Sequence, residues 1–361
     1  MTRVLADILK EPAQLSASLA HAVSIGAVDM KRAASLLRAA RSVLIVGIGA
    51  SWHAGMAMQA ILHGYGVSAV LMDASELFYF GEVSKGAVVV MLSRSGRSIE
   101  IIRLLEKCKN QSVVIVAITN NPESSLALEA DVSLYTSTDF DHSVSISTYS
   151  AIALTAALLA LNTAGQPVES LAGELRLAIH QTANSIEGWR AIIKTCGWLD
   201  GNAPTYFLAR GTSLASAHEA RLLWEETAKA PATALTTGGF RHGPQEIVRE
   251  GLRVAMWIDA ERLRVQDLTL AADLERLGAH VLLIGQDLDS TAPQCVIKLP
   301  SVPAALQFAI DIIPAQIAAE SLAELRGEDC DNFRLCSYIV EDEGGLGDLE
   351  ESPAAAGEQN R

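Results

Sequence analysis

Aromatic residues make up only 5% of the 361-residue sequence, and charged residues only 19%. Aliphatic side chains take their place, since hydrophobic residues account for 50% of the chain. This composition favours a layered α/β fold, in which the strands of a parallel sheet are buried on both faces. The length is enough for roughly two domains of ordinary size.

Basic residues are also scarce: 28 Lys and Arg stand against 42 Asp and Glu, which gives a net charge of −14. A chain this acidic is not expected to bind nucleic acid non-specifically, because that binding needs a basic surface. An anionic substrate would therefore need a local positive site.

The sequence has five cysteines, an odd number, and no C-x-x-C pair. We therefore expect free thiols and a reducing compartment. The first residues contain no apolar segment of the kind found in signal peptides. The most apolar stretch, residues 151–161, is too short to cross a bilayer. These features predict a cytoplasmic protein without membrane contact, and no pattern indicates a metal or another cofactor.

The segment Ser93-Arg-Ser-Gly-Arg-Ser98 follows the apolar run 87–92 and precedes a helical pattern at 99–105. A loop between a strand and a helix collects free backbone N–H groups at the positive end of the helix dipole. Its hydroxyls, with Arg94 and Arg97, suit a phosphate group. An ordinary Ser/Gly turn is the alternative, because such turns are common.

Strands alternate with helical patterns through the first half, which predicts a parallel sheet with ligands outside the carboxyl ends of its strands. Ser51 lies at such an end, after the first strand. Gly47-x-Gly49 also suggests a dinucleotide fold, but Trp52 occupies the place of the third small residue, so we disfavour that interpretation. The strands of this half are predicted at 42–47, 67–72, 86–92, 112–118 and 131–135.

The strand pattern recurs after residue 200 at nearly the same intervals, which indicates two copies of one α/β unit. Only the first copy keeps the hydroxyl-rich loop. The predicted organisation is N-terminal helices at 1–41, interrupted at Pro12 and Gly26, a first domain at 42–167, a helical linker at 168–199, a second domain at 200–326, a tail at 327–340 and a disordered acidic end at 341–361.

Two further segments carry candidate site residues. The loop at 137–148 opens a long helix, for which Ser147 or Thr148 is a good N-cap. The hydroxyls of Ser145, Ser147 and Thr148 there could also meet an anion. In the second half, His242 lies between Arg241 and a Gly-Pro pair, on an exposed loop after two glycines. Such a histidine is either structural or a proton-transfer group.

Together, Gly49-Ala-Ser51, the loop at 93–98, Ser145-Ile-Ser-Thr148, Trp224-Glu-Glu226 and Gly239-Phe-Arg-His-Gly-Pro244 resemble the sugar isomerase (SIS) family. More narrowly, they resemble the isomerase half of glucosamine-6-phosphate synthase and its stand-alone relatives. The resemblance covers about residues 1–340. It implies two tandem SIS domains, each a doubly wound, flavodoxin-like five-stranded parallel sheet flanked by helices.

The resemblance also implies roles for residues. A hexose or aminohexose 6-phosphate would be bound, with Glu226 moving a proton between C1 and C2. His242 would open the sugar ring and could come from the neighbouring subunit of a homodimer. The phosphate and sugar would contact Ser51, Ser93, Arg94, Ser95, Ser98, Ser145, Ser147 and Thr148.

The chain departs from this family where the synthase uses lysines. Leu223 stands one turn before the predicted base, Cys336 stands at the Schiff-base position, and no lysine occurs in 299–361. No glutamine-hydrolysing domain is present, so glutamine-dependent synthesis is not expected. The leading hypothesis is a deaminase or deglycase of aminosugar or fructosamine 6-phosphates. The alternatives are an aldose–ketose phosphate isomerase and a catalytically silent sugar-phosphate sensor.

Overall fold

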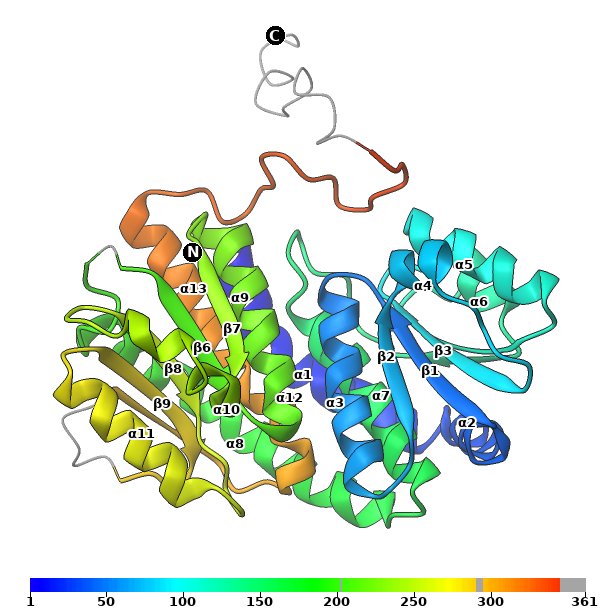
Figure 1. Cartoon of the computed structure of the whole chain (residues 1–361), viewed down its shortest axis with the longest axis horizontal. Coiled ribbons are helices and arrows are strands. Elements are labelled where there is room, and N and C mark those ends of the chain that lie inside the picture. The colour runs from blue at the N-terminus through cyan, green and yellow to red at the C-terminus, as the bar shows by residue number, and fades with distance from the viewer. Residues whose placement is uncertain (202, 290–294, 345–361) are drawn as a thin grey trace, which may run out of the picture.

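The computed structural model describes residues 1–201, 203–289 and 295–344. Most of the predicted disordered end lies outside these residues. Two α/β domains stand side by side, each built on one five-stranded parallel sheet (Figure 1). The first half contains α1 (Arg3–Val23), α2 (Ala27–Ala39), β1 (Ser42–Gly47), α3 (Ala50–Gly64), β2 (Ala69–Asp73), α4 (Ala74–Phe80), β3 (Ala87–Ser93), α5 (Ile99–Asn110), β4 (Val114–Thr119), α6 (Ser125–Glu129), β5 (Val132–Tyr135) and α7 (Ser147–Thr163).

A long helix, α8, links the two domains. The second half contains α8 (Val168–Thr195), β6 (Thr205–Ala209), η1 (Gly211–Ser213), α9 (Leu214–Ala228), β7 (Ala232–Thr236), α10 (Thr237–Phe240), η2 (Pro244–Ile247), β8 (Arg253–Trp257), α11 (Arg264–Arg276), β9 (His280–Gln286), β10 (Cys295–Leu299), η3 (Ala304–Leu306), α12 (Phe308–Asp311) and α13 (Ile313–Arg326). The five strands predicted in the first half are therefore confirmed, with their ends shifted by at most two residues.

The two sheets have the same strand order. The first runs β2-β1-β3-β4-β5, and the second, taken in the same sense, runs β7-β6-β8-β9-β10. This is the doubly wound, flavodoxin-like order, and it confirms the predicted fold class. The central strand β3 is buried along its whole length, as its uninterrupted apolar sequence predicts. In the first sheet the order reverses between β1 and β3, so the loops after these two strands open into one crevice.

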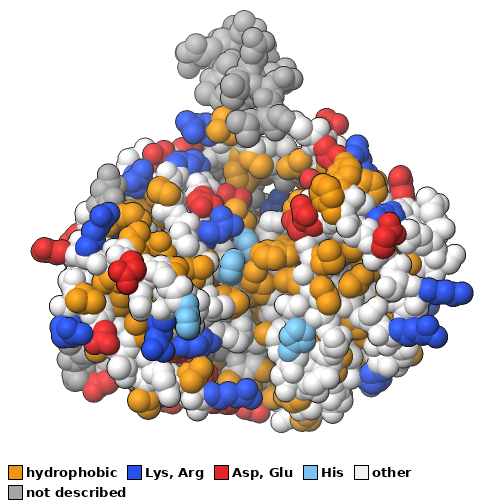
Figure 2. Space-filling model, viewed as in Figure 1, with side chains coloured by type: hydrophobic (Ala, Val, Ile, Leu, Met, Phe, Trp, Pro, Cys, Tyr) orange, Lys and Arg blue, Asp and Glu red, His pale blue; other side chains and the backbone are white. Residues whose placement is uncertain are grey.

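The helices between the two sheets form a common core. α7 is buried on nearly every side, and α1 packs against α7, α8 and α13. One cluster of buried hydrophobic residues runs from α1 through both domains to α13. On the face seen in Figure 2, Lys and Arg side chains are scattered among acidic ones. No helix in the described part of the chain is long and apolar enough to cross a membrane.

Two predictions about the fold are wrong, and one strand was not predicted. Pro12 lies inside α1 and does not interrupt it, although a break near Gly26 is present. Residues 232–236, for which no strand is predicted, form the edge strand β7. Cys196 and Cys295 form a disulfide, with Cα atoms 5.6 Å apart, because the end of α8 meets the start of β10. Cys108, Cys330 and Cys336 are free thiols, and cysteine usage therefore does not indicate a reducing compartment.

A carboxyl group is buried where α1, α7 and α13 meet. Glu11 is fully buried, and its Oε1 accepts hydrogen bonds from Ser150 Oγ (2.5 Å) and Gln316 Nε2 (3.3 Å). Its Oε2 has no hydrogen-bond partner. Burial raises the pKa of Glu11 from 4.5 to about 8. Glu11 is therefore mainly protonated in the folded protein at neutral pH.

This burial gives stability a predictable pH dependence. Between pH 4.5 and 8 the folded state binds more protons at Glu11 than the unfolded state does. The contribution of Glu11 to the free energy of unfolding is therefore largest below pH 4.5. The contribution falls as pH rises, by up to about 1.4 kcal/mol per pH unit. In Glu11→Gln we expect most of this fall to disappear. Urea unfolding should show the variant gaining stability relative to wild type between pH 5 and 8. The exposed Glu174→Gln serves as control, and parallel curves for wild type and Glu11→Gln would contradict the prediction.

Candidate functional site

A pocket of about 230 Å³ opens at the carboxyl ends of β1 and β3. The loops after both strands contribute to it, as the strand order requires. The last turn of α9 forms a second side, and the C-terminal segment 333–340 forms a third. We call it the phosphate-loop pocket. Of the predicted site residues, it brings together Ser51, Ser93, Arg94, Ser95, Ser98, Ser145 and Glu226.

The loop 93–98 is held in shape by its own hydroxyls. Ser93 Oγ accepts a hydrogen bond from Gly96 N (3.0 Å), and Ser95 Oγ accepts one from Arg97 N (3.2 Å). Because each of these hydroxyls acts as an acceptor, its own proton can be donated to an anion. Ser98 is the N-cap residue of α5, and its side chain makes no capping hydrogen bond. The predicted strand–loop–helix geometry is therefore present.

The two arginines of the loop differ. Arg97 is exposed and does not line the pocket. Arg94 lines it, and its guanidinium donates to Ser143 O (3.2 Å), Ser145 Oγ (3.1 Å) and Tyr338 O (2.9 Å). Arg94 thus ties the loop to the C-terminal segment, and it is the one Lys, Arg or His side chain among the described residues that line the pocket.

Glu226 and Glu100 both line the pocket, and Glu226 is the carboxyl group for which proton transfer is predicted. It lies in the last turn of α9, and burial, reinforced by the nearby carboxyl of Glu219, raises its pKa to about 8. Arg94 and Lys229 lower this pKa in part. A carboxyl group that titrates near neutral pH can both accept and donate a proton, as a general acid–base catalyst must.

Two predicted anion ligands lie elsewhere. Ser147 and Thr148 are buried and do not line the pocket. They are not the N-cap of α7 either, because Ile146 holds that position and makes no side-chain cap. Instead, the carboxylate of Asp141 accepts hydrogen bonds from the backbone N–H groups of residues 146–148, at 2.9–3.0 Å. Because Asp141 occupies the positive end of α7, this helix end is not free for a substrate anion.

His242 lies outside the phosphate-loop pocket of its own chain. It is exposed, as predicted, in the turn after α10. In Figure 1, α10 lies below the arrowhead of β7, whereas the C-terminal segment crosses the top of the molecule. At the positions where the related synthase has lysines, Cys336 lines the pocket and Leu223 is buried in the core.

A buried pair that no sequence pattern predicts joins the two domains. His53 Nδ1 lies 2.8 Å from Glu219 Oε2, and both residues are almost completely buried. The pair joins α3 of the first domain to α9 of the second. Burial lowers the pKa of His53 to about 3 and raises that of Glu219. We therefore expect a neutral imidazole bonded to a protonated carboxyl, a pair without net charge. The two residues are 166 positions apart, and no local pattern indicates their contact.

Comparisons with known proteins agree with this geometry. Residues 36–164 match the family model of the SIS domain. The glutamine–fructose-6-phosphate aminotransferase (isomerizing) of Pyrobaculum aerophilum is 29% identical over 345 residues, which cover 93% of this chain and 57% of that protein. The chain thus spans little more than half the length of the curated relatives that it matches.

Solved structures show the same fold. The C-terminal domain of glucosamine-fructose-6-phosphate aminotransferase from Francisella tularensis matches with a TM-score of 0.83 and 22% identity, covering 92% of this chain and 98% of that one. Glucosamine-6-phosphate deaminase from Thermotoga maritima matches with a TM-score of 0.77 and 20% identity, covering 94% and 99%. Residues 36–164 thus carry an SIS domain, and the two parallel sheets give the whole chain the fold of these two structures.

Proposed function

We propose that this protein is an enzyme that acts on an aminosugar or fructosamine 6-phosphate, as a deaminase or deglycase. The observation that carries the proposal is that a hydroxyl-rich anion loop and the carboxyl group of Glu226 line one pocket. The names of the relatives support a phosphorylated hexose as substrate. The loop would bind the 6-phosphate through Ser93, Ser95 and Ser98, which leaves the other end of the sugar for Glu226.

The proposed chemistry uses Glu226 as the proton carrier. In the ring-opened sugar, its carboxylate would take the proton next to the carbonyl or iminium carbon and return it to the neighbouring carbon. Binding of the remote phosphate would hold these carbons in place, and such orientation lowers the barrier without taking part in the bond changes. Water would then release the nitrogen as ammonia or an amine and leave a hexose phosphate.

The side chains that line the pocket favour a substrate that carries its own nitrogen. No lysine lines the pocket in the described part of the chain, and Arg94 is held by three hydrogen bonds. The protein therefore offers no amine there for a Schiff base with a ketose. Isomerisation through an enediol needs no such amine, so an aldose–ketose isomerase is the second candidate. A silent sensor is the third.

A panel of substrates separates these functions. The purified chain would be incubated with glucosamine 6-phosphate, galactosamine 6-phosphate, fructosamine 6-phosphates and fructose 6-phosphate. Ammonia, released amine and sugar products would be assayed. We expect nitrogen release from at least one amino substrate. Interconversion without nitrogen release would indicate the isomerase, whereas a raised melting temperature without turnover would indicate the sensor.

We further propose that the enzyme is a homodimer in which each subunit supplies His242 to the other's pocket. The proposal is supported by the family resemblance and by the position of His242 outside its own pocket. Mixing His242→Ala with Glu226→Gln chains should restore activity in the mixed dimer, which has one intact site. A monomeric mass of 38.4 kDa for an active wild-type protein would contradict this arrangement.

A further inference from the structure

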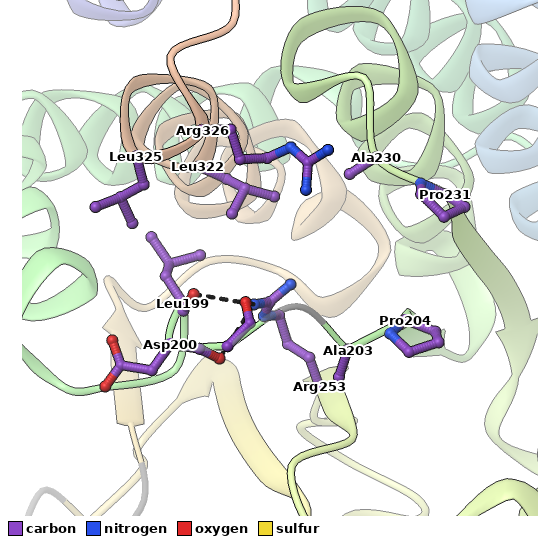
Figure 3. Close-up of a pocket in the computed structure, with 11 residues that line it drawn as sticks. Leu199, Asp200, Ala203, Pro204, Ala230, Pro231, Arg253, Leu322, Leu325 and Arg326 are labelled. Atoms are coloured by element: carbon purple, nitrogen blue, oxygen red, sulfur yellow. Dashed lines mark hydrogen bonds between the residues drawn. The ribbon is translucent and has the colours of Figure 1, made fainter.

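A second cavity, of about 340 Å³, lies at the amino-terminal ends of the strands of the second sheet (Figure 3). It is lined by residues 199–201, 203 and 204 before β6, 230 and 231 before β7, Arg253 at the start of β8, and residues 322, 325 and 326 of α13. We call it the amino-edge pocket. It shares no lining residue with the phosphate-loop pocket. Its walls combine apolar side chains, among them Leu199, Pro204, Pro231 and Leu322, with the charged side chains of Asp200, Arg253 and Arg326.

Arg253 brings a buried positive charge to this pocket. The residue is 3% exposed, and its guanidinium donates to Trp198 O (3.0 Å), Leu199 O (2.9 Å), Gly201 O (3.0 Å) and Thr205 Oγ1 (3.2 Å). These acceptors are all neutral oxygens. The guanidinium also lies 5.8 Å from the ring centres of Trp198 and Trp224.

No carboxylate among the described residues forms an ion pair with Arg253. The side chain of Asp200 points away from the guanidinium in Figure 3, and only the backbone oxygen of Asp200 is within hydrogen-bond distance, at 3.3 Å. Buried charges in proteins are as a rule paired, because carbonyl dipoles compensate only part of the lost hydration. Within the described residues, the positive charge of Arg253 therefore has no carboxylate at salt-bridge distance.

Arg326 adds a second guanidinium to the same cavity, from the last turn of α13. Burial and the positive charge of Arg326 lower the pKa of Arg253, and the charge of Asp200 raises it by less, so repulsion between the two cations is only partly offset. An anion between them would remove this repulsion and would supply the missing counter-ion. The apolar side chains of the wall would at the same time contact a compact apolar part of the ligand.

We propose that the amino-edge pocket binds a small organic anion, a carboxylate or a phosphate ester with a compact apolar body, between Arg253 and Arg326. This inference does not depend on the proposed enzymatic function. Benzoate and phenyl phosphate represent the two anion sources, and benzyl alcohol is the neutral control. Binding to the full chain would be measured by isothermal titration calorimetry at constant ionic strength.

We expect saturable binding of at least one anion, with an unchanged Kd in the Ser95→Ala/Ser98→Ala variant of the phosphate loop. Arg326→Gln should weaken binding about tenfold or more, because a hydrogen bond to a charged group is lost. Arg276→Gln, which removes an exposed arginine of α11, is the matched control and should leave Kd unchanged. Arg253→Lys, with folding checked by circular dichroism, should also weaken binding.

The preferred probe identifies the anion source: benzoate indicates a carboxylate ligand, and phenyl phosphate a phosphate ester. Three results would overturn the proposal. These are no saturable binding of either anion, binding that the phosphate-loop variant loses entirely, and equal affinity in Arg326→Gln and Arg276→Gln. Equally tight binding of benzyl alcohol would also contradict it, since the two cations would then contribute nothing.

Discussion

Glu226→Gln should lower kcat/KM for the sugar phosphate by about 10²–10⁴-fold, the usual contribution of a positioned acid–base group. The substitution keeps the shape of the side chain and removes its ability to exchange a proton. Because the carboxylate is the active form, kcat/KM of the wild-type enzyme should rise with pH and level off above the pKa of about 8. Steady-state rates between pH 6 and 9 would measure both effects.

Glu225→Gln is the control for this experiment. Glu225 is the neighbouring residue on α9, but it does not line the phosphate-loop pocket and instead pairs with Arg221 (2.5 Å). We expect its kcat/KM to stay close to that of wild type. If Glu226→Gln kept more than a tenth of wild-type kcat/KM, the proton-transfer role of Glu226 would be wrong, even if the protein still bound the substrate.

Gly96→Ala should damage both the phosphate loop and the stability of the first domain. Gly96 has φ +64°, and a Cβ atom on it would lie 2.2 Å from Ser124 Oγ and 2.5 Å from Ser124 Cβ. Ser124 is buried, and its hydroxyl caps α6 by accepting from Ala127 N (3.2 Å). The loop or this cap must therefore move. We expect a KM at least tenfold higher and a loss of roughly 3 kcal/mol in the free energy of unfolding.

Two further variants separate the causes. Gly66→Ala has a similar φ of +77° with no heavy atom within 4 Å, so it measures backbone strain alone, about 1 kcal/mol. Adding Ser124→Gly to Gly96→Ala removes the clash and should recover part of the stability, as a double-mutant cycle would show. Equal destabilisation by Gly96→Ala and Gly66→Ala would contradict the prediction, because the contact with Ser124 would then add nothing to the loss of stability.

The sequence was sufficient for those parts of the site that are local in the chain. The loop at 93–98 is a strand, a turn and a helix within about 20 residues, so apolar runs and turn residues define it. The family resemblance indicates the role of Glu226, and burial of its side chain raises its pKa. The edge strand β7 was missed because it is short, half-exposed and made mainly of Ala and Thr, which resembles a loop.

Contacts between distant residues could not be predicted in this way. Arg94 and Tyr338, whose hydrogen bond fixes the third wall of the pocket, are 244 positions apart. Cys196 and Cys295 are 99 apart, and their spacing matches no known motif. Asp141 lies only a few residues before α7, but Ser147 and Thr148 are equally good caps by residue type. The choice among them depends on the path of the loop in three dimensions.

The position of α1 sets the order in which the chain can complete its fold. Its partners include α13 and the segment after it: Thr2 Oγ1 donates to Glu320 (2.9 Å), and Val4 N donates to Asp331 (3.0 Å). α1 can pack on α7 and α8 earlier, but more than 300 residues must be synthesised before its contacts with α13 can form. Until then the side of α1 that faces α13 stays exposed, and contacts at such a sequence separation are slow to form.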